Sequence, residues 1–340
     1  MLKLIVNIVF VVVAFSQHIL AQGTSPVGVN FILVNFNQPP TTLTVNEAPL
    51  KYNKDFAFSM QVDDANLSLY TIGYPFFEGI DGNPGLFYTD GCGNPHNFKM
   101  SSSVYVFNSN NLNGPDVHLD NSYGQLSWEQ MDTIYNDNWG ILNHGINGNN
   151  SSDSAFMSYS IRRNRSYIRR KMYNTTAGGV TTHVFVNPGG NSNYTIPAFN
   201  NNNISALYQN TISPIGNNGG DVNNDSIDWT LPHRLNRKNA AITNVVSLVD
   251  GLANSSVGGA NYWCPIFAEN LGNHYTTFES DFNYIANTYG INGLDNILMT
   301  TDEEIQDYLI VRDATALNYV LNGTTLFIQY SGEVPNDLLF

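Results

Sequence analysis

Short strands are predicted wherever apolar residues alternate with smaller or polar ones along this chain. The clearest is FAFSMQV at 56–62, where every second residue is large and apolar, the period of a pleated strand. The runs WGILN at 139–143 and HVFV at 183–186 are shorter strands of the same kind. A polar residue follows each run directly, so polar side chains are expected to meet at one edge of a sheet.

Helices are predicted between these strands, where apolar residues recur every three or four positions. This pattern covers 128–138 and 276–289, and 300–313 opens with a Thr cap and an acidic first turn, which favours the helix dipole. The basic run 159–174 is predicted as an exposed helix, which also offers an anchor for an acidic glycan. Strands and helices alternate from 51 to about 313, which predicts an α/β protein with a parallel sheet or barrel.

The first 21 residues have the pattern of a signal peptide. One Lys precedes the apolar run LIVNIVFVVVAF, and Ala21 is a suitable last residue of the cleaved segment. The run is too short for a comfortable membrane span, which needs about 20 residues. We therefore expect a secreted, periplasmic or cell-surface protein without a stable membrane span after cleavage.

Short β segments are predicted on either side of the main domain, which we place at 51–315. Residues 22–50 form an N-terminal β arm, with strand-like runs at 27–36 and 41–53 around a Pro-Pro turn. At the other end, 316–340 contains the strand-like TTLFIQY, and we expect this β segment to continue beyond residue 340.

The composition of the chain limits the classes of molecule that it is expected to bind. The net charge of −14 and the pI of about 4.6 argue against nucleic acid. Charged residues make up only 12% of the chain, so solubility depends on amide and hydroxyl groups, which suit an exported protein and contacts with sugars. The two cysteines, Cys92 and Cys264, are a possible disulfide in an oxidising compartment.

Five motifs follow one another in an order that resembles the NodB-type polysaccharide deacetylases, a family of carbohydrate esterases. They are the strand end Met60–Ala65 with its two acids, His144–Gly148, the turn Val186–Gly190, the acids before a Trp in Asp225–Trp229, and His274. The order and spacing of the motifs carry the resemblance, which spans about 51–313. It implies a distorted (β/α) barrel of the polysaccharide-deacetylase type.

The resemblance also implies a role for each polar strand end. Asp63 would be the general base, Asp64 and His144 would bind a divalent metal, expected to be zinc, and His274 would protonate the leaving group. Adjacent acids at a strand end also cap helices or form turns, and a strand-end His can be merely polar. The substrate-binding residues implied are Asn187, Pro188, Gly189, Asp228 and Trp229.

The sequence departs from the family at two positions. Gly148 stands where the family has its second metal-binding His, so an amide oxygen of Asn147 or Asn149 would have to complete the site. The third motif has no Arg, and Arg234 or Arg237 are the candidates to replace it.

These observations leave three functions open. The first is a secreted, metal-dependent esterase that hydrolyses N- or O-linked acetyl groups of a polysaccharide or oligosaccharide. The second is a catalytically impaired protein of the same fold that binds glycan without turnover. The third is a glycoside hydrolase with a second acid about 5–9.5 Å from Asp63, for which Asp225, Asp228 and Glu269 are candidates.

Overall fold

The computed structural model describes residues 7–9, 24–26, 30–107, 121–148, 151, 153–172, 180, 182, 184–190, 205–209, 234–256 and 261–335. The chain divides into two compact units, Leu50–Gln306 and a second unit made of Met1–Pro49 with Asp307–Phe340. Among the residues described, no helix combines the length and the apolar character needed to cross a membrane.

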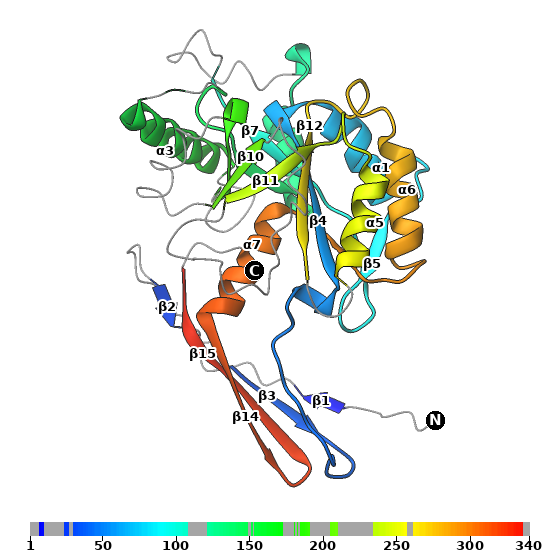
Figure 1. The fold of residues 1–340 in the computed structure, drawn as a ribbon. Helices are drawn as coiled ribbons and strands as arrows, with labels where there is room; N and C mark the ends of the chain where they lie inside the picture. The colour runs from blue at the N-terminus through cyan, green and yellow to red at the C-terminus, as the bar shows by residue number, and fades with distance from the viewer. Residues whose placement is uncertain are drawn as a thin grey trace. The chain divides into compact units, whose positions relative to one another are not determined.

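The larger unit is built around parallel strands whose pairings form a closed circuit (Figure 1). In circuit order these strands are β4 (Phe56–Val62), β7 (Ser101–Val104), β8 (Gly140–Asn143), β9 (Val184–Val186), β10 (Ser205–Gln209), β11 (Arg234–Asn239) and β12 (Trp263–Ala268). β12 then pairs with β4 and closes the circuit, and β13 (Ile297–Met299) pairs with the first half of β4. The predicted α/β class with a distorted (β/α) barrel is confirmed.

β4 is buried along its whole length, and its two faces differ in character. Phe56 and Phe58 pack against Tyr289 and Phe282 of α6 (Phe278–Tyr289), with ring centroids 5.4 and 6.2 Å apart. Ser59 and Gln61 lie on the opposite face, because side chains alternate along a strand. Phe56 and Phe58 therefore anchor β4 to α6, while Ser59 and Gln61 give the barrel interior polar groups on the side-chain face that leads to Asp63.

The four predicted helices are present with small shifts in their ends. They are α2 (Trp128–Asn136), α3 (Ser154–Lys171), α6 and α7 (Asp302–Ala314). A capping box of Ser127 and Gln130 begins α2, and the Asp153 carboxylate caps α3. α3 buries Met157, Ile161 and Ile168, and its exposed basic residues include Arg162, Arg163, Arg169 and Arg170. Shorter elements complete the unit: α1 (Tyr74–Glu78), α5 (Val245–Ser255), β5 (Phe87–Thr89) and β6 (Pro95–Asn97).

The smaller unit contains an antiparallel sheet. β14 (Thr315–Asn322) and β15 (Thr325–Pro335) form a hairpin, β3 (Asn30–Asn35) pairs with β15, and β1 (Asn7–Val9) and β2 (Thr24–Pro26) are short additions. The strands predicted at 27–36 and in TTLFIQY correspond to β3 and β15. The strand predicted at 41–53 was wrong, because Lys51–Asn53 form a 3-10 turn in which Tyr52 and Asn53 have φ of 61° and 56°. The signal peptide at 1–21 stays a prediction, and β1 lies within that range.

Candidate active site

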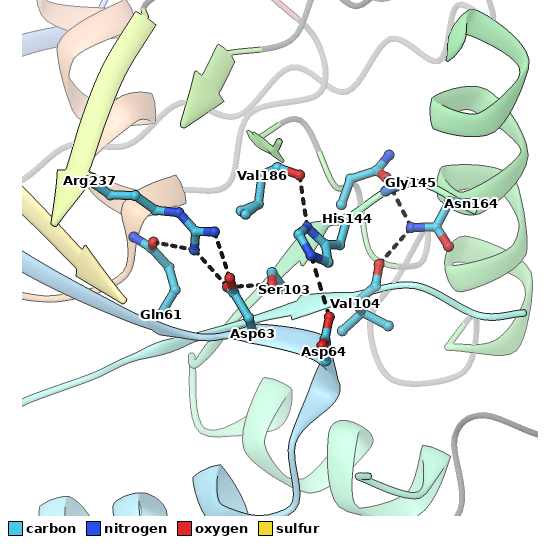
Figure 2. A network of polar contacts seen from close by, with 11 residues as sticks. Gln61, Asp63, Asp64, Ser103, Val104, His144, Gly145, Asn164, Val186 and Arg237 are labelled. Carbon is cyan, nitrogen blue, oxygen red and sulfur yellow. Dashed lines mark hydrogen bonds and ion pairs between the residues drawn. The ribbon is translucent and has the colours of Figure 1, made fainter. Parts of the chain in front are cut away.

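The polar residues predicted at strand ends gather at the carboxyl-terminal mouth of the barrel (Figure 2). Asp63 and Asp64 follow β4, His144 follows β8, and Arg237 belongs to β11. The ends of parallel strands open on the same side of a barrel, which is where such folds place their functional groups.

Asp63 is held as a buried carboxylate. It is 2% exposed, and Arg237 donates two hydrogen bonds to it, from Nη1 to Oδ1 and from Nη2 to Oδ2, each 2.6 Å long. The Ser103 hydroxyl on β7 donates a third, to Oδ1 at 2.7 Å. Burial alone would raise the pKa of Asp63, but the Arg237 guanidinium and these hydrogen bonds outweigh burial and lower the pKa. Asp63 is therefore ionised at neutral pH.

Arg237 connects Asp63 to the barrel interior. Its side chain is fully buried, its guanidinium carbon lies 4.1 Å from the ring centroid of Phe267, and Nη1 also donates to Gln61 Oε1 at 3.3 Å. The Gln61 amide in turn donates to Asp302 Oδ1. Of the two arginines considered as replacements for the missing motif residue, Arg237 makes the contact with Asp63, and the side chain of Arg234 lies outside the described residues.

Asp64 points away from its neighbour because of its backbone. Its φ of 60° is in the left-handed region, which Asp enters more readily than most residues. The turn that results leaves Asp63 inside the barrel and the Asp64 side chain 42% exposed. The two consecutive acids thus lie in different environments: Asp63 is buried, and Asp64 is partly exposed to solvent.

His144 faces Asp64 with one ring nitrogen and the backbone with the other. Its Nδ1 lies 2.8 Å from the Val186 carbonyl oxygen, and its Nε2 lies 3.4 Å from Asp64 Oδ1. Donation from Nδ1–H to the carbonyl fixes the tautomer and directs the Nε2 lone pair at Asp64. Burial lowers the pKa of His144, but Asp64 and Asp63 outweigh it and the pKa is raised overall. The contact therefore requires either a proton on Nε2 or a cation between the two side chains.

The distance between these two atoms is suitable for a shared metal ion. Zinc–nitrogen and zinc–oxygen bonds of about 2.0–2.2 Å meeting at a tetrahedral angle would place the two donor atoms about 3.3–3.5 Å apart. Asp64 Oδ1 and His144 Nε2 fit as two ligands of such a site. No group of three or more His, Cys, Asp or Glu side chains suited to a metal exists in the described part of the chain.

The space beside Gly148 is occupied by the Tyr105 ring. Gly148 has φ of 65°, and a Cβ atom added there would lie 2.9 Å from Cε1 of the Tyr105 ring. A larger side chain there would strain the backbone and displace the Tyr105 ring. Asn147, predicted as a substitute ligand, is 6% exposed beside Gly148, and its metal role stays a prediction. Tyr105, one residue beyond β7, was not foreseen as part of the site.

Two asparagines hold the loop after β8 against α3. Asn143 donates to the Ile161 carbonyl at 3.0 Å and accepts from the Gly145 backbone N–H at 2.9 Å. Asn164 on α3 donates to both Asn143 Oδ1 and the Val104 carbonyl. These bonds fix the backbone on either side of His144 and so fix the direction of its ring.

Glu269 is a site residue at the end of β12. It directly follows Ala268, the last residue of that strand, and is partly buried. Burial, with the negative charges of Asp63 and Asp64 adding to it, raises the pKa of Glu269 to about 7. From the sequence, Glu269 was predicted only as a candidate second acid of a glycoside hydrolase.

The structure does not bring His274 into this cluster. Its side chain is exposed, and within the described residues it makes no hydrogen bond or ion pair with Asp63, Asp64 or His144. The chain leaves the barrel after Glu269, and the loop bonds instead to the segment after Asp64, with Leu271 N–H donating to Ser68 Oγ.

The third motif shapes the site through its backbone. Asn187 and Pro188 are buried, Gly189 is exposed with φ of 60°, and the preceding carbonyl of Val186 accepts from His144. Asp225, Asp228 and Trp229 lie outside the described residues. Substrate binding by Asn187, Pro188, Gly189, Asp228 and Trp229 stays a prediction.

The possible disulfide is absent from the structure. Cys92 is an exposed free thiol in a turn, while Cys264 is a free thiol fully buried within β12. A thiol enclosed in a barrel strand cannot reach a surface turn without moving the backbone.

Comparisons with known proteins gave the following. No protein-family model and no curated protein matches the chain. The solved structure of the Streptococcus pyogenes deacetylase PplD in complex with acetate is similar at a TM-score of 0.35 and 15% identity, over 53% of this chain and 62% of that one. A CE4 family pseudoenzyme from Bacillus anthracis, BA3943, is similar at a TM-score of 0.39 and 9% identity, over 75% of this chain and 66% of that one. Each similarity spans less than two thirds of the other protein's length.

Proposed function

We propose that this protein is a divergent hydrolase of the NodB-type deacetylase kind, which acts outside the cell and removes acetyl groups from a polysaccharide or oligosaccharide. One observation carries the proposal: an Arg-held carboxylate, Asp63, lies beside a carboxylate–imidazole pair, Asp64 and His144, whose donor atoms are 3.4 Å apart. This arrangement combines a base that stays ionised with two donors that suit a divalent cation, expected to be zinc.

The cation would be held by Asp64 Oδ1 and His144 Nε2. When bound, it would supply a Lewis acid that polarises the acyl carbonyl and lowers the pKa of a nearby water. With two side-chain ligands in place of the usual three, the site would bind its metal weakly and leave more positions to water and substrate.

Asp63 and the residues that hold it would orient the attacking water and accept its proton. Asp63 Oδ2 accepts one hydrogen bond from Arg237 and keeps a second lone pair, with which it would orient a water and take its proton. Arg237 and Ser103 would keep Asp63 in place throughout, so the carboxylate need not reorganise when it becomes protonated.

Metal binding and acetate release test the proposal together. We expect the purified protein to bind zinc at a 1:1 ratio in calorimetry and to release acetate from acetylated oligosaccharides, with both properties lost in Asp64→Ala. Glu129→Ala, at an exposed position in the first turn of α2, is the matched control and should retain both. Release of reducing ends without acetate would support a glycoside hydrolase instead.

A second function is favoured by Tyr105. The ring that fills the position of a third ligand is what a protein retained for glycan binding alone would tolerate, and His144 can then carry a proton opposite Asp64 in place of a cation. In that case the protein would bind no zinc even at excess, and would bind glycan with equal affinity in the wild type and in His144→Gln. Zinc binding lost on Asp64→Ala would contradict this second function.

A further inference from the structure

The pairing of β4 and β12 fixes the position of Glu269. The two strands run in parallel register, with Ile266 opposite Met60 and Ala268 opposite Val62. The residues that directly follow these paired strand ends are Asp63 after β4 and Glu269 after β12. Adjacent strands of a sheet lie about 4.8 Å apart, so the two acids begin from neighbouring backbone positions at the barrel mouth.

Side-chain alternation places Glu269 on the same side of the barrel wall as Asp63. Gln61 and Phe267 are register partners, and both contact Arg237 inside the barrel. Side chains alternate along a strand with a period of two, so the next inward positions are Asp63 on one strand and Glu269 on the other. Asp63 does contact Arg237, which shows that the alternation holds at this end of β4.

The charged groups around Glu269 favour its protonated form. Burial and the anionic Asp63 and Asp64 raise its pKa to about 7, whereas Arg237 and His144 act in the opposite direction. Tyr105 is a further titratable group of this cluster, and burial, with the charges of Asp64 and Glu269 adding to it, raises its pKa. Near neutral pH, Glu269 would therefore exist in both forms, as a group that donates and regains a proton must.

We propose that Glu269 is the general acid of the hydrolysis proposed above, on which this inference rests. Water adds to the acyl carbon and its proton passes to Asp63. As the bond from the acyl carbon to the sugar nitrogen or oxygen breaks, that atom takes the proton of the Glu269 carboxyl group. The products are acetic acid and the free amine or hydroxyl of the sugar, and transfer of the proton from Asp63 through solvent to Glu269 restores the starting state.

The leaving group provides the test, because a good leaving group needs no proton. Hydrolysis of an acetylated oligosaccharide should fall about 100-fold or more in Glu269→Gln, whereas hydrolysis of 4-nitrophenyl acetate should stay within about 3-fold of the wild type. The fall in rate above about pH 7 on the oligosaccharide should also disappear in Glu269→Gln. Glu279→Gln, which changes an exposed carboxylate on α6, is the control and should alter neither rate.

Each other outcome has a defined meaning. Equal losses on both substrates in Glu269→Gln would overturn the role as an acid and leave a structural one, as would the selective pattern appearing in His274→Gln alone. A wild type that hydrolyses neither substrate would overturn the proposed function itself, and the general acid with it. Infrared difference spectra of wild type minus Glu269→Gln give a readout without substrate: a protonated carboxyl band that titrates near pH 7 is expected, and its absence would overturn the proposal.

Discussion

The mouth of the barrel has two halves that differ in how completely they are built. After the roles proposed above, we call Asp63, Ser103, Arg237 and Glu269 the acid–base half, and Asp64, Tyr105, His144 and Gly148 the cation half. In the first half the central carboxylate is buried and accepts three hydrogen bonds. In the second, a half-exposed carboxylate faces one imidazole, and the Tyr105 ring lies against Gly148. Asp63 is thus firmly held, in a site that offers two side-chain donors, Asp64 and His144, to a cation.

The largest effect is expected when Arg237, the ion-pair partner of Asp63, is replaced. Arg237→Leu should lower the free energy of unfolding by about 3–5 kcal/mol near neutral pH, because it leaves a buried carboxylate unpaired. The pKa of Asp63 is lowered in the folded protein, so this stabilisation is present above the unfolded pKa of about 3.9 and is lost as the pH falls through the folded value. Urea unfolding measures the effect, and it should shrink in acid.

Asp63→Asn in the Arg237→Leu background supplies the control, since it removes the unpaired charge and should recover part of the loss. Arg162→Leu, on the exposed face of α3, should change stability by less than about 0.5 kcal/mol. An Arg237→Leu protein as stable as the wild type would contradict the buried ion pair.

The next prediction concerns a third metal ligand, introduced into the cation half by substitution. Gly148→His alone should cost about 1–3 kcal/mol, because φ is 65° and the new side chain meets the Tyr105 ring. Combining it with Tyr105→Ala opens the space for a third ligand, and we expect zinc affinity to rise about 10-fold or more over Tyr105→Ala alone. Calorimetry with Tyr105→Ala alone as the reference measures this gain. Equal affinities in the two variants would show that position 148 does not face the Asp64–His144 pair.

The smallest effect concerns the ion pair of the cation half. Without metal, Asp64→Asn should cost less than about 1 kcal/mol, because the carboxylate is half exposed and screened by solvent. The pKa of His144 is raised in the folded state, so its contribution is present below the unfolded pKa of about 6.5 and is lost as the pH rises through the folded value. The cost should therefore be larger at about pH 5 than at about pH 8.

Thermal unfolding of the chelator-treated protein at both pH values checks this prediction, with Asp313→Asn, which changes a carboxylate ion-paired with Arg312, as the comparison. NMR titration of His144 should show a lower pKa in Asp64→Asn. An unchanged pKa would mean that Asp64 does not interact with the ring.

The barrel and half of the site could be predicted because strand ends are visible in the sequence. The alternation in FAFSMQV identified β4, and the polar residue after each strand identified Asp63, Asp64 and His144 as neighbours. These features depend on local periodicity, and the parallel arrangement then brings the strand ends together whatever the loops between them contain.

The remaining parts depend on relations that periodicity does not contain. Glu269 and His274 lie on the same strand-to-helix connection, and only the register of β12 with β4 shows that Glu269 is the one at the barrel mouth. Tyr105 lies against Gly148, whose φ is in the left-handed region, and neither feature has a periodic pattern in the sequence. Arg237 was one of two candidates, and the choice required knowing which inward position of β11 meets Asp63.

The left-handed backbone at Asp64 has a consequence for anyone who randomises this position. Asn and Gly enter that region at low cost, whereas Val and Ile would incur a conformational penalty of about 1–3 kcal/mol before their chemistry is felt. Variants in a library at Asp64 would thus differ first in how well they fold. Only the variants that fold would show the effect of the substitution on metal binding or proton transfer. Asp64→Asn adopts the left-handed backbone at low cost, so this substitution tests the role of the carboxylate without disturbing the fold.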